Sequence, residues 1–396
     1  DCTTHGKETW TAVSALSEIK VAGKYYLTQD VTLTDTWKPA NVFLCLNGHK
    51  ITGADGKAVI ELSIAAFTLT DCKGTGKITH ASGGTGCGVY ISGGTFNMYG
   101  GSITGNTATD GRGRGGGVYV TSGGGAFKMF GGSITGNKAT DGGGVYKIGS
   151  NSTFTMTGGS ITGNTADDSG GGVYVNGGSF TMSGGSITGN KADGTGGGVC
   201  VNYDGTFNMS NNSCITGNTA YHGGGVYVAR TPDSNNYKPG NFAMSSGTIG
   251  GTTTNDANQA QYGGGVYLAR FNLPDKYSDS ATYIRVFVAQ GNTNQSLMIQ
   301  GGKIEDNTAT NNGGGISLDI NTCSANYCTM KVHVDDTKIT NNRAQLGQDV
   351  YAYKAVPHTE LYLPKASKIA ENGRWLNENT SETLKDEAID YDPIQR

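Results

Sequence analysis

The chain has 396 residues, of which 66 are glycine and only 15% are charged, and its formal net charge is −3. Basic runs with interleaved aromatic residues are absent, which argues against a nucleic-acid-binding surface. No apolar stretch approaches the roughly 18 residues that a membrane-spanning helix needs, so we expect no insertion into a membrane.

Residues 9–20 predict a short helix near the N-terminus. Trp10, Val13, Leu16 and Ile19 recur at helical spacing, which places them on one face. A repetitive fold built from strands exposes strand edges at its open end, and a helix there would cover them. We therefore expect residues 1–40 to form an N-terminal cap that includes this helix.

A phrase repeats through the middle of the chain. Each copy of GGSITGN follows an F-x-M element and precedes, after a variable gap, GGGVYV. The clearest F-x-M elements begin at Phe96, Phe127, Phe154, Phe180 and Phe207. With degenerate copies on either side, they indicate about eleven units of roughly 26 residues. Residues 41–375 are thus predicted to form one repetitive domain, and the acidic segment 376–396 is interpreted as a C-terminal cap or a linker.

Each unit alternates polar and apolar residues with period two, which indicates strands and not helices. One unit cannot bury its apolar face, but stacked units can supply a common core. The inward-facing side chains of one unit are predicted to be Phe96, Met98, Ile103, Val118 and Val120. Those of the next unit are predicted to be Phe127, Met129, Ile134, Val145 and Ile148.

Asparagine recurs at one corner of the predicted coil, as the last residue of SITGN, three positions after the isoleucine. Stacked side chains there can satisfy the backbone groups of the turn and one another, which is a structural role. The glycine triplets suit corners that need positive φ or a close backbone approach. The asparagines are Asn106, Asn137, Asn164, Asn190, Asn218 and Asn307.

With these phrases the chain resembles right-handed parallel β-helix proteins, the pectate-lyase-like superfold, over roughly residues 40–370. GGGVY and GGSITGN are similar to phrases of bacterial surface β-helix proteins and of some gut-bacterial β-helix glycosidases, including lacto-N-biosidase-like ones. The resemblance implies an all-β fold, a single-stranded right-handed parallel β-helix with about eleven coils and a short N-terminal helical cap. It is specific for the fold and weak for the activity.

The repeat becomes irregular after Val228. Insertions at 229–241, 269–296 and 319–329 all leave the end of the tyrosine-bearing strand, so they are expected to cluster along one edge. Loops that a rigid scaffold carries are common places for function, and here they predict a cleft. A fourth insertion, 251–262, leaves a different corner. The structural alternative is drift, because solenoid corners tolerate insertions at little cost.

Arginines and tyrosines near these loops are the predicted substrate-binding residues. Arg230 and Arg270 begin adjacent loops at the same register, where they would either pair with nearby aspartates or bind an anionic group of a glycan. The outward tyrosines form a stripe that suits sugar rings, although such ladders also stabilise sheets by cross-strand packing. The predicted set is Tyr174, Tyr227, Tyr267, Arg230, Arg270 and Tyr277.

Hydrolysis of a glycosidic bond usually needs two carboxyl groups that flank the bond. Asp275 lies in the longest insertion, Asp319 ends a strand, and Asp335 follows His333. These three aspartates are the predicted acid/base set, with His333 as a helper, and the alternative for each is a solvated surface carboxylate. No metal-ligand or cofactor motif is present, and no acidic cluster supports a polysaccharide lyase, so a glycoside hydrolase is favoured if the protein is an enzyme.

Two functions are consistent with these observations. The first is an extracellular carbohydrate-directed protein that acts on a host or plant glycan in a cleft beside the loops of the C-terminal half. The second is a bacterial surface adhesin or stalk without catalysis, whose loops contact a host surface protein. Abundant Thr, Ser, Asn, Gly and Tyr with few charges favour an extracellular or cell-surface location for both.

Overall fold

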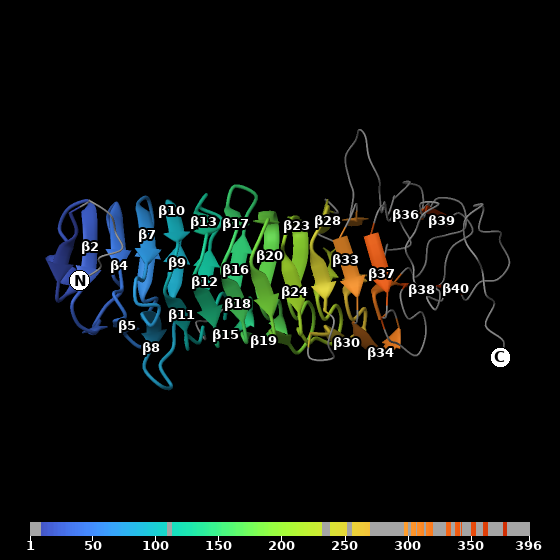
Figure 1. Ribbon diagram of the computed structural model, residues 1–396, viewed down its shortest axis with the longest axis horizontal. Helices are drawn as coiled ribbons and strands as arrows, with labels where there is room; N and C mark the ends of the chain where they lie inside the picture. Colours follow the sequence, from blue (N-terminus) through green and yellow to red (C-terminus); the bar gives the residue numbers. More distant parts are fainter. Residues whose placement is uncertain are drawn as a thin grey trace. The chain divides into compact units, whose positions relative to one another are not determined.

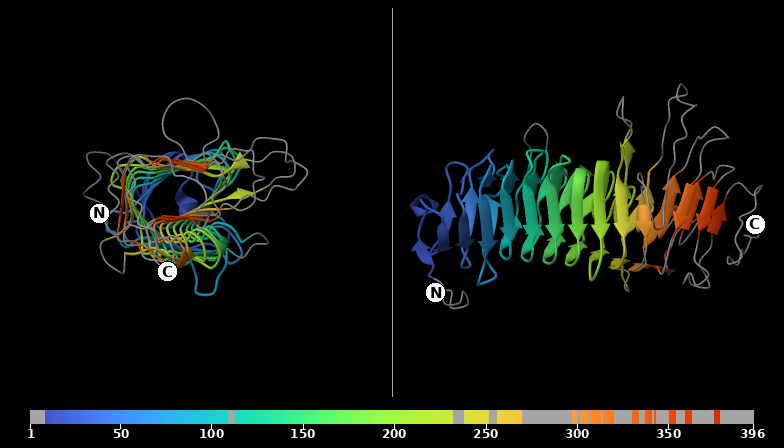
Figure 2. Two further views of the ribbon diagram at one scale, coloured as in Figure 1. Left: turned by 90° about the vertical axis from the view of Figure 1, so that its right-hand side faces the viewer. Right: turned by 90° about the horizontal axis from the view of Figure 1, so that it is seen from above.

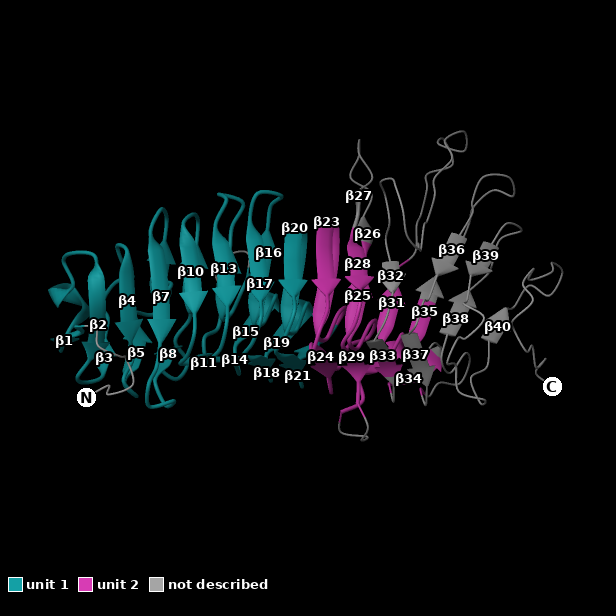
Figure 3. Cartoon of the chain, turned by 45° about the horizontal axis from the view of Figure 1, so that its top comes forward, with its two compact units in different colours: residues 1–193 teal, residues 194–396 magenta. Residues whose placement is uncertain are grey.

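A computed structural model of the protein describes most of residues 9–269 and separate strands beyond them. The described ranges are 9–108, 113–231, 238–251, 256–269, 297–299, 302–305, 307–312, 314–319, 330–333, 337–340, 342, 350–353, 359–362 and 375–377. The chain divides into two compact units, Asp1–Asp193 and Gly194–Arg396 (Figure 3). They are called unit 1 and unit 2 below.

Unit 1 is built from short parallel strands that lie side by side in successive coils (Figure 1). The residues of GGGVYV and of F-x-M form its largest sheet. The strands of this sheet are β1 (Thr11–Val13), β2 (Gly23–Leu27), β4 (Val42–Cys45), β6 (Ile60–Leu62), β7 (Ala66–Thr70), β9 (Val89–Ile91), β10 (Thr95–Met98), β12 (Val118–Val120), β13 (Ala126–Met129), β16 (Val145–Ile148), β17 (Thr153–Met156) and β20 (Val173–Met182).

A second sheet runs through the coils of unit 1, and a third sheet contributes a strand to three of them. Seven described strands of the second sheet carry the SIT residues or their equivalents: β3 (Val31–Thr32), β5 (Lys50–Gly53), β8 (Lys77–His80), β11 (Ser102–Thr104), β14 (Ser133–Thr135), β18 (Ser160–Thr162) and β21 (Ser186–Thr188). The third sheet consists of β15 (Lys138–Asp141), β19 (Thr165–Ser169) and β22 (Lys191–Ala192). Seen along the stack, the strands of unit 1 surround one interior (Figure 2). The fold is a parallel β-solenoid, in which about seven turns can be followed.

Identical residues of neighbouring coils lie in register. Phe96 pairs with Phe127, Phe127 with Phe154, and Phe154 with Phe180. Their rings stack with centroids 5.2, 4.7 and 4.4 Å apart, and all four side chains are fully buried. Because each buried phenylalanine contributes about 1.5–3 kcal/mol, this stack is a principal source of the stability of unit 1.

One predicted core position is wrong. Val120 pairs with Lys147, and Lys147 pairs with Val175, so the lysine and not Ile148 occupies the inward position. Its side chain is completely buried, and Nζ donates hydrogen bonds to the carbonyl oxygens of Gly149, at 2.8 Å, and of Gly177. Burial lowers the pKa of Lys147 to about 8, because the interior solvates its charge poorly.

Buried asparagines form a ladder along one corner of unit 1, as predicted. In Asn137, Nδ2 donates to Oδ1 of Asn164 at 3.0 Å and to the carbonyl oxygen of Ile103 at 2.9 Å. Asn164 repeats the pattern with Asn190 and with Ile134. Each amide therefore satisfies both its neighbours and the backbone of the turn, which is required for polar groups without access to water.

The first asparagine of this ladder has no asparagine before it. His80 takes that place, with Nδ1 2.8 Å from Oδ1 of Asn106 and Nε2 2.8 Å from the carbonyl oxygen of Lys57. The imidazole is buried. Both partners are hydrogen-bond acceptors, so a neutral imidazole donates to only one of the two oxygens and the protonated ring donates to both.

The predicted N-terminal helix is not formed. Residues 11–13 form β1, which pairs in parallel with β2, and the only helical segment in the described residues is the 3₁₀ turn Leu16–Glu18. Leu16 is buried, whereas Trp10 and Ile19 are only partly covered. Strand pairing thus outweighs the helical spacing of these four residues, and the boundaries of the predicted cap stay a prediction.

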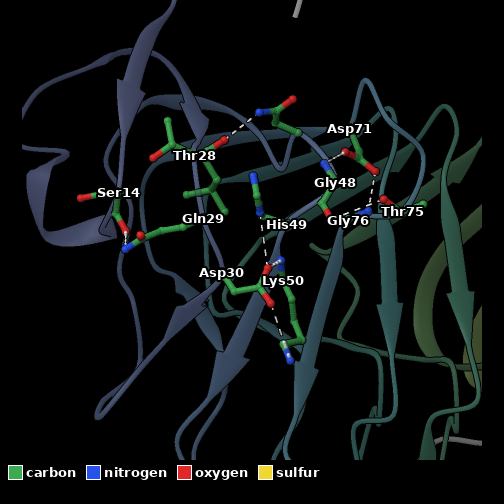
Figure 4. A network of polar contacts seen from close by, with 12 residues as sticks. Ser14, Thr28, Gln29, Asp30, Gly48, His49, Lys50, Asp71, Thr75 and Gly76 are labelled. Atoms are coloured by element: carbon green, nitrogen blue, oxygen red, sulfur yellow. Dashed lines mark hydrogen bonds and ion pairs between the residues drawn. The ribbon is translucent and has the colours of Figure 1, made fainter. Parts of the chain in front are cut away.

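Carboxylates hold the turns of the first coils (Figure 4). The two oxygens of Asp71 accept hydrogen bonds from the backbone amides of Gly48 and Gly76, at 2.7 and 2.6 Å. Asp30 accepts the amide of Lys50 at 3.0 Å, and this bond, with the charge of Lys50, lowers the pKa of Asp30. These bonds lie at the corner that precedes β5 and β8, which is a different corner from that of the ladder asparagines.

Unit 2 repeats these strand types. Its largest sheet contains β23 (Val199–Met209), β25 (Val226–Val228), β28 (Asn241–Met244), β31 (Val266–Leu268), β32 (Leu297–Ile299), β35 (Ile316–Asp319), β38 (Val350–Tyr353) and β40 (Trp375–Asn377). The SIT-type strands are β24 (Cys214–Thr216), β29 (Thr248–Gly250), β33 (Gly302–Glu305) and β37 (Thr337–Thr340). The shorter pairings join β30 (Gln259–Tyr262) with β34 (Thr308–Asn312), β36 (Met330–His333) with β39 (Thr359–Tyr362), and β26 (Arg230–Thr231) with β27 (Lys238–Pro239).

The points where the three major insertions leave unit 2 lie side by side. Val228 pairs with Leu268, and Leu268 pairs with Leu318. The prediction that insertions 229–241, 269–296 and 319–329 start from one corner is thereby confirmed. The first insertion rises as an antiparallel pair in which Arg230 faces Pro239, and most of the other two lies outside the described residues.

The asparagine ladder of unit 2 includes two residues that the sequence analysis missed. Asn218 donates to Asn258, Asn258 to Asn307, and Asn307 to Asn342, with Nδ2 to Oδ1 distances of 2.9, 2.9 and 3.0 Å. Asn258 ends the irregular stretch GTTTNDAN, which hides its register in the sequence. No helix in the described part of the chain is long and apolar enough to cross a bilayer.

Replacing Asn164 by alanine is expected to destabilise unit 1 by about 2 kcal/mol or more. The change removes the acceptor of the Asn137 amide groups and leaves the carbonyl oxygen of Ile134 without its donor, while Oδ1 of Asn190 keeps only the backbone amide of residue 164. Urea denaturation measures the effect. Asn151→Ala, at an exposed position, is the control and should change the free energy of unfolding by less than about 0.5 kcal/mol. Equal effects of the two substitutions would contradict the role of the ladder.

The stability of the protein is expected to rise between about pH 8 and pH 10.5 through Lys147. In this window the unfolded chain binds more protons than the folded one, so raising the pH favours folding, by up to about 3 kcal/mol at 1.4 kcal/mol per pKa unit. Lys147→Met should abolish this part of the pH dependence in denaturation measured at several pH values. Lys128→Met, on the exposed face of β13, should leave the wild-type profile unchanged.

Candidate functional site

The outward tyrosines of unit 1 form a column, but most of them are not exposed. Tyr90 pairs with Tyr119, Tyr119 with Tyr146, and Tyr146 with Tyr174. Their ring centroids are 5.3, 5.3 and 5.0 Å apart. Tyr146 is only 1% exposed and Tyr174 7%. Tyr174 is therefore covered and stacked on Tyr146, as the alternative of cross-strand packing predicts, and its assignment to substrate binding stays a prediction.

A second column of side chains covers the tyrosines. It consists of the residue directly before each glycine triplet, and we call it the pre-triplet column. Gly142, the first glycine of one triplet, has φ +64°, and a methyl group there would lie 2.6 Å from the carbonyl oxygen of Val145. Only glycine permits this turn, which folds Asp141 back towards Tyr146. The pre-triplet residues include Arg114, Asp141 and Ser169 in unit 1 and Thr195, His222 and Tyr262 in unit 2.

In unit 2 two adjacent pre-triplet residues, His222 and Tyr262, are aromatic. The ring centroid of His222 lies 5.2 Å from that of Tyr262, in a stacked arrangement, and 4.7 Å from that of Tyr267. Tyr227 and Tyr267 stack beneath them at 5.5 Å. Tyr221 joins the group, 4.5 Å from His222 and 5.9 Å from Tyr262. These five residues are called the aromatic cluster.

The aromatic cluster combines buried and exposed rings. Tyr267 is 6% exposed and supports the group from below, whereas Tyr221 is 43% exposed. His222, Tyr227 and Tyr262 are half-buried. The cluster therefore presents an aromatic face to solvent that rests on packed rings.

Backbone hydrogen bonds hold the exposed part of the cluster in place. The amides of Tyr221 and His222 both donate to the carbonyl oxygen of Gly194, at 3.0 and 3.1 Å. The carbonyl oxygen of Tyr221 in turn accepts the amides of Gln261 and Tyr262, at 3.0 and 3.3 Å. Because these hydrogen bonds hold the backbone, the stacking of a flat ligand on the rings should cost little backbone conformational entropy.

In unit 1 the same column is charged. The guanidinium carbon of Arg114 lies 5.1 Å from the centroid of the Tyr146 ring, which is a cation–π arrangement. Burial raises the pKa of Asp141 to about 6, and the nearby carboxylate of Asp168 adds to the shift, while Arg114 opposes it. Burial also raises the pKa of Tyr146 to about 12. The arrangement places a guanidinium and a perturbed carboxyl group beside buried aromatic rings.

Two of the predicted substrate-binding residues, Tyr227 and Tyr267, lie together in the aromatic cluster. Arg230 is the first residue of β26, and its side chain is outside the described part of the structure. Arg270 and Tyr277 also lie outside the described residues. The structure thus places three of the six predicted binding side chains, in the two units.

The predicted catalytic residues are mostly beyond the described part of the chain. Asp275 and Asp335 lie outside the described residues. Asp319 ends β35 and pairs with Tyr353, and His333 ends β36 and pairs with Tyr362, in a different sheet. The described backbone positions of Asp319 and His333 thus belong to different sheets, and the assignment of all four residues stays a prediction.

Sequence reasoning missed Tyr221, His222, Tyr262, Arg114 and Asp141. A signal existed for all of them except Tyr221: the residue before each glycine triplet changes from coil to coil, while the triplet and the following valine recur. Because the residue at this position varies while the rest of the repeat is constant, the fold does not require a particular side chain there. Among the residues with described side chains, no group of three His, Cys, Asp or Glu could hold a metal ion.

The comparisons with known proteins assign this chain to no family. No family model matches the chain, and neither the curated proteins nor the solved structures give a significant match.

Proposed function

We propose that the protein is an extracellular carbohydrate-directed β-helix protein whose aromatic cluster binds a glycan. The observation that carries this proposal is the partly exposed face formed by Tyr221, His222 and Tyr262 on top of Tyr227 and Tyr267. The C–H faces of sugar rings pack against aromatic rings, and the tyrosine hydroxyls and imidazole nitrogens can form hydrogen bonds with sugar hydroxyls. A rigid face of this kind suits a repetitive glycan of host or plant origin.

The proposal includes a right-handed solenoid of about eleven coils, at a bacterial cell surface or secreted. Right-handed crossover is the general rule for parallel strands that a connection joins within one sheet. The insertions that leave unit 2 at Val228, Leu268 and Leu318 would extend the binding surface as loops beside the tyrosine-bearing strands.

Hydrolysis of the bound glycan is the enzymatic form of this proposal. Asp275, Asp319 and Asp335 are its acid/base candidates and His333 is the helper, since loops next to an aromatic platform are suitable places for two carboxyl groups. Arg230 and Arg270 would then contact the glycan from the bases of two of the loops.

A non-catalytic stalk or adhesin is the second candidate, with a host surface protein as its partner. The regular phenylalanine stack and the asparagine ladder within each unit favour it, because they make a stiff scaffold that catalysis does not need. In that function the loops and not the aromatic cluster would make the contact.

Tyr221→Ala is expected to weaken glycan binding at least ten-fold, since it removes the most exposed ring of the cluster. Ten-fold corresponds to about 1.4 kcal/mol, which is within the range of one aromatic contact. A glycan array followed by isothermal titration calorimetry measures the change. Tyr99→Ala removes another exposed tyrosine, in unit 1, and should not alter the affinity for the glycan. Tyr99 is 55% exposed and Tyr221 is 43% exposed. Retention of full affinity by Tyr221→Ala would refute the assignment of the cluster.

Product release from the glycans that bind tests the enzymatic form. If the protein hydrolyses them, Asn replacement of Asp275, Asp319 or Asp335 is expected to reduce kcat at least 100-fold for one or more of the three, because the acid or base is lost. Binding should persist in the inactive variant. If wild-type protein binds a glycan and releases no product over a long incubation, the non-catalytic alternative is supported.

A further inference from the structure

The charged part of the pre-triplet column in unit 1 has features that the scaffold does not require. Neighbouring coils place serine or threonine at the same position, as at Ser169. Arg114 and Asp141 instead occupy it in adjacent coils, and they pair as an isolated parallel bridge. Neither takes part in a described ion pair within 4 Å, so their side chains are not held as a salt bridge.

Arg114 is oriented by aromatic rings. Its guanidinium carbon lies 5.1 Å from the centroid of the Tyr146 ring, over the ring face. Burial by itself would lower the pKa of Arg114, but Tyr146, Tyr119 and Asp141 raise it. Among its donors, Nε is buried and has no hydrogen-bond partner in the structure. Because Nε is enclosed by protein atoms, a ligand at this point would accept hydrogen bonds from the Nη groups of Arg114.

Acceptors lie next to this donor. Asp141 is half-buried, and the exposed carboxylate of Asp168 from the next coil is close enough to raise the pKa of Asp141. Asp168 forms no described ion pair, whereas its neighbour Asp167 pairs with Lys138 at 2.9 Å. The group therefore offers guanidinium donors and carboxylate acceptors together.

The charges of these side chains favour a neutral ligand over a charged one. Among the described residues, one guanidinium faces two carboxylates at neutral pH, so an anionic sugar would be repelled by the carboxylates and a cationic one by Arg114. A neutral sugar avoids both repulsions. The guanidinium edge can donate to two adjacent hydroxyl oxygens, and the carboxylates can accept from hydroxyl groups.

We propose that Arg114, Asp141 and Asp168, beside the half-buried Tyr119, form a second glycan-binding site that takes adjacent hydroxyl groups of a neutral sugar. The site rests on the proposed function for its ligand class, but it uses different residues from the aromatic cluster. It lies within unit 1 and needs no residue of the loops.

The test is calorimetric titration of the full chain at pH 7.5 with cellotetraose, mannotetraose and galactotetraose as neutral probes, tetragalacturonate as the anionic probe and chitosan tetramer as the cationic one. The wild type is expected to bind at least one neutral probe at two sites and the charged probes at most at the aromatic cluster. Arg114→Lys keeps the positive charge but loses the planar guanidinium group. It should abolish binding at one site or lower the affinity of that site ten-fold. Asp141→Asn should do the same without a change of shape. Asp167→Asn, on the same strand as Asp168, is the matched control and should bind as the wild type does.

The outcomes separate this site from the aromatic cluster. Loss of one site in Arg114→Lys and Asp141→Asn, with the other site lost in Tyr221→Ala, supports both assignments. If Tyr221→Ala abolishes all binding while the two unit 1 variants match the wild type, the proposed function stands and this inference is overturned. Tighter binding of tetragalacturonate than of the neutral probes, or no binding of any probe, also overturns it. Unfolding temperatures show that the variants are folded.

Discussion

The structure depends on the repetition of identical residues in register, and the buried asparagine ladder is the interaction that makes the register strict. In each unit an asparagine amide bonds to the next asparagine and to the backbone of the preceding coil. A coil that slipped by one residue would bury several amide and carbonyl groups without partners, at a cost of about 1–3 kcal/mol for each group. The ladder therefore allows one alignment, and the phenylalanine stack follows it.

Strict register has a consequence for the outer surface. Because each coil repeats the same path, a residue type at one position becomes a column, and a change in one coil alters the column at one point only. The glycine triplets turn the pre-triplet column over the tyrosines, so a side chain of this column lies against the tyrosine of the next coil. Unit 1 uses it for Arg114 and Asp141, and unit 2 uses it for His222 and Tyr262. The path of the backbone is the same in each coil, and the types of side chain in the pre-triplet column change from coil to coil.

Much of the fold could be predicted from the sequence because its contacts repeat with the period of the chain. Phe96, Met98, Ile103 and Val118 are buried as the alternation predicts, and the corner asparagines stack. The errors have local causes. Residues 9–20 have helical spacing, but strand pairing with β2 outweighs it. Lys147 was not recognised as a core residue because a lysine is rarely buried, yet its long stem fills the position and its ammonium reaches two carbonyl groups. Asn258 was hidden by an insertion.

The sequence by itself determined the repeat, the strands, the inward faces and the corner at which the insertions leave, because these follow from period and alternation along one chain. Only the tertiary structure decided which outward residues meet. Tyr174 and Tyr267 are covered, and Tyr221, His222 and Tyr262 form the exposed aromatic face. The physical reason is the left-handed turn at the first glycine of each triplet: it folds a side chain onto the neighbouring coil, tens of residues away in sequence. No pattern within a single unit shows such a contact.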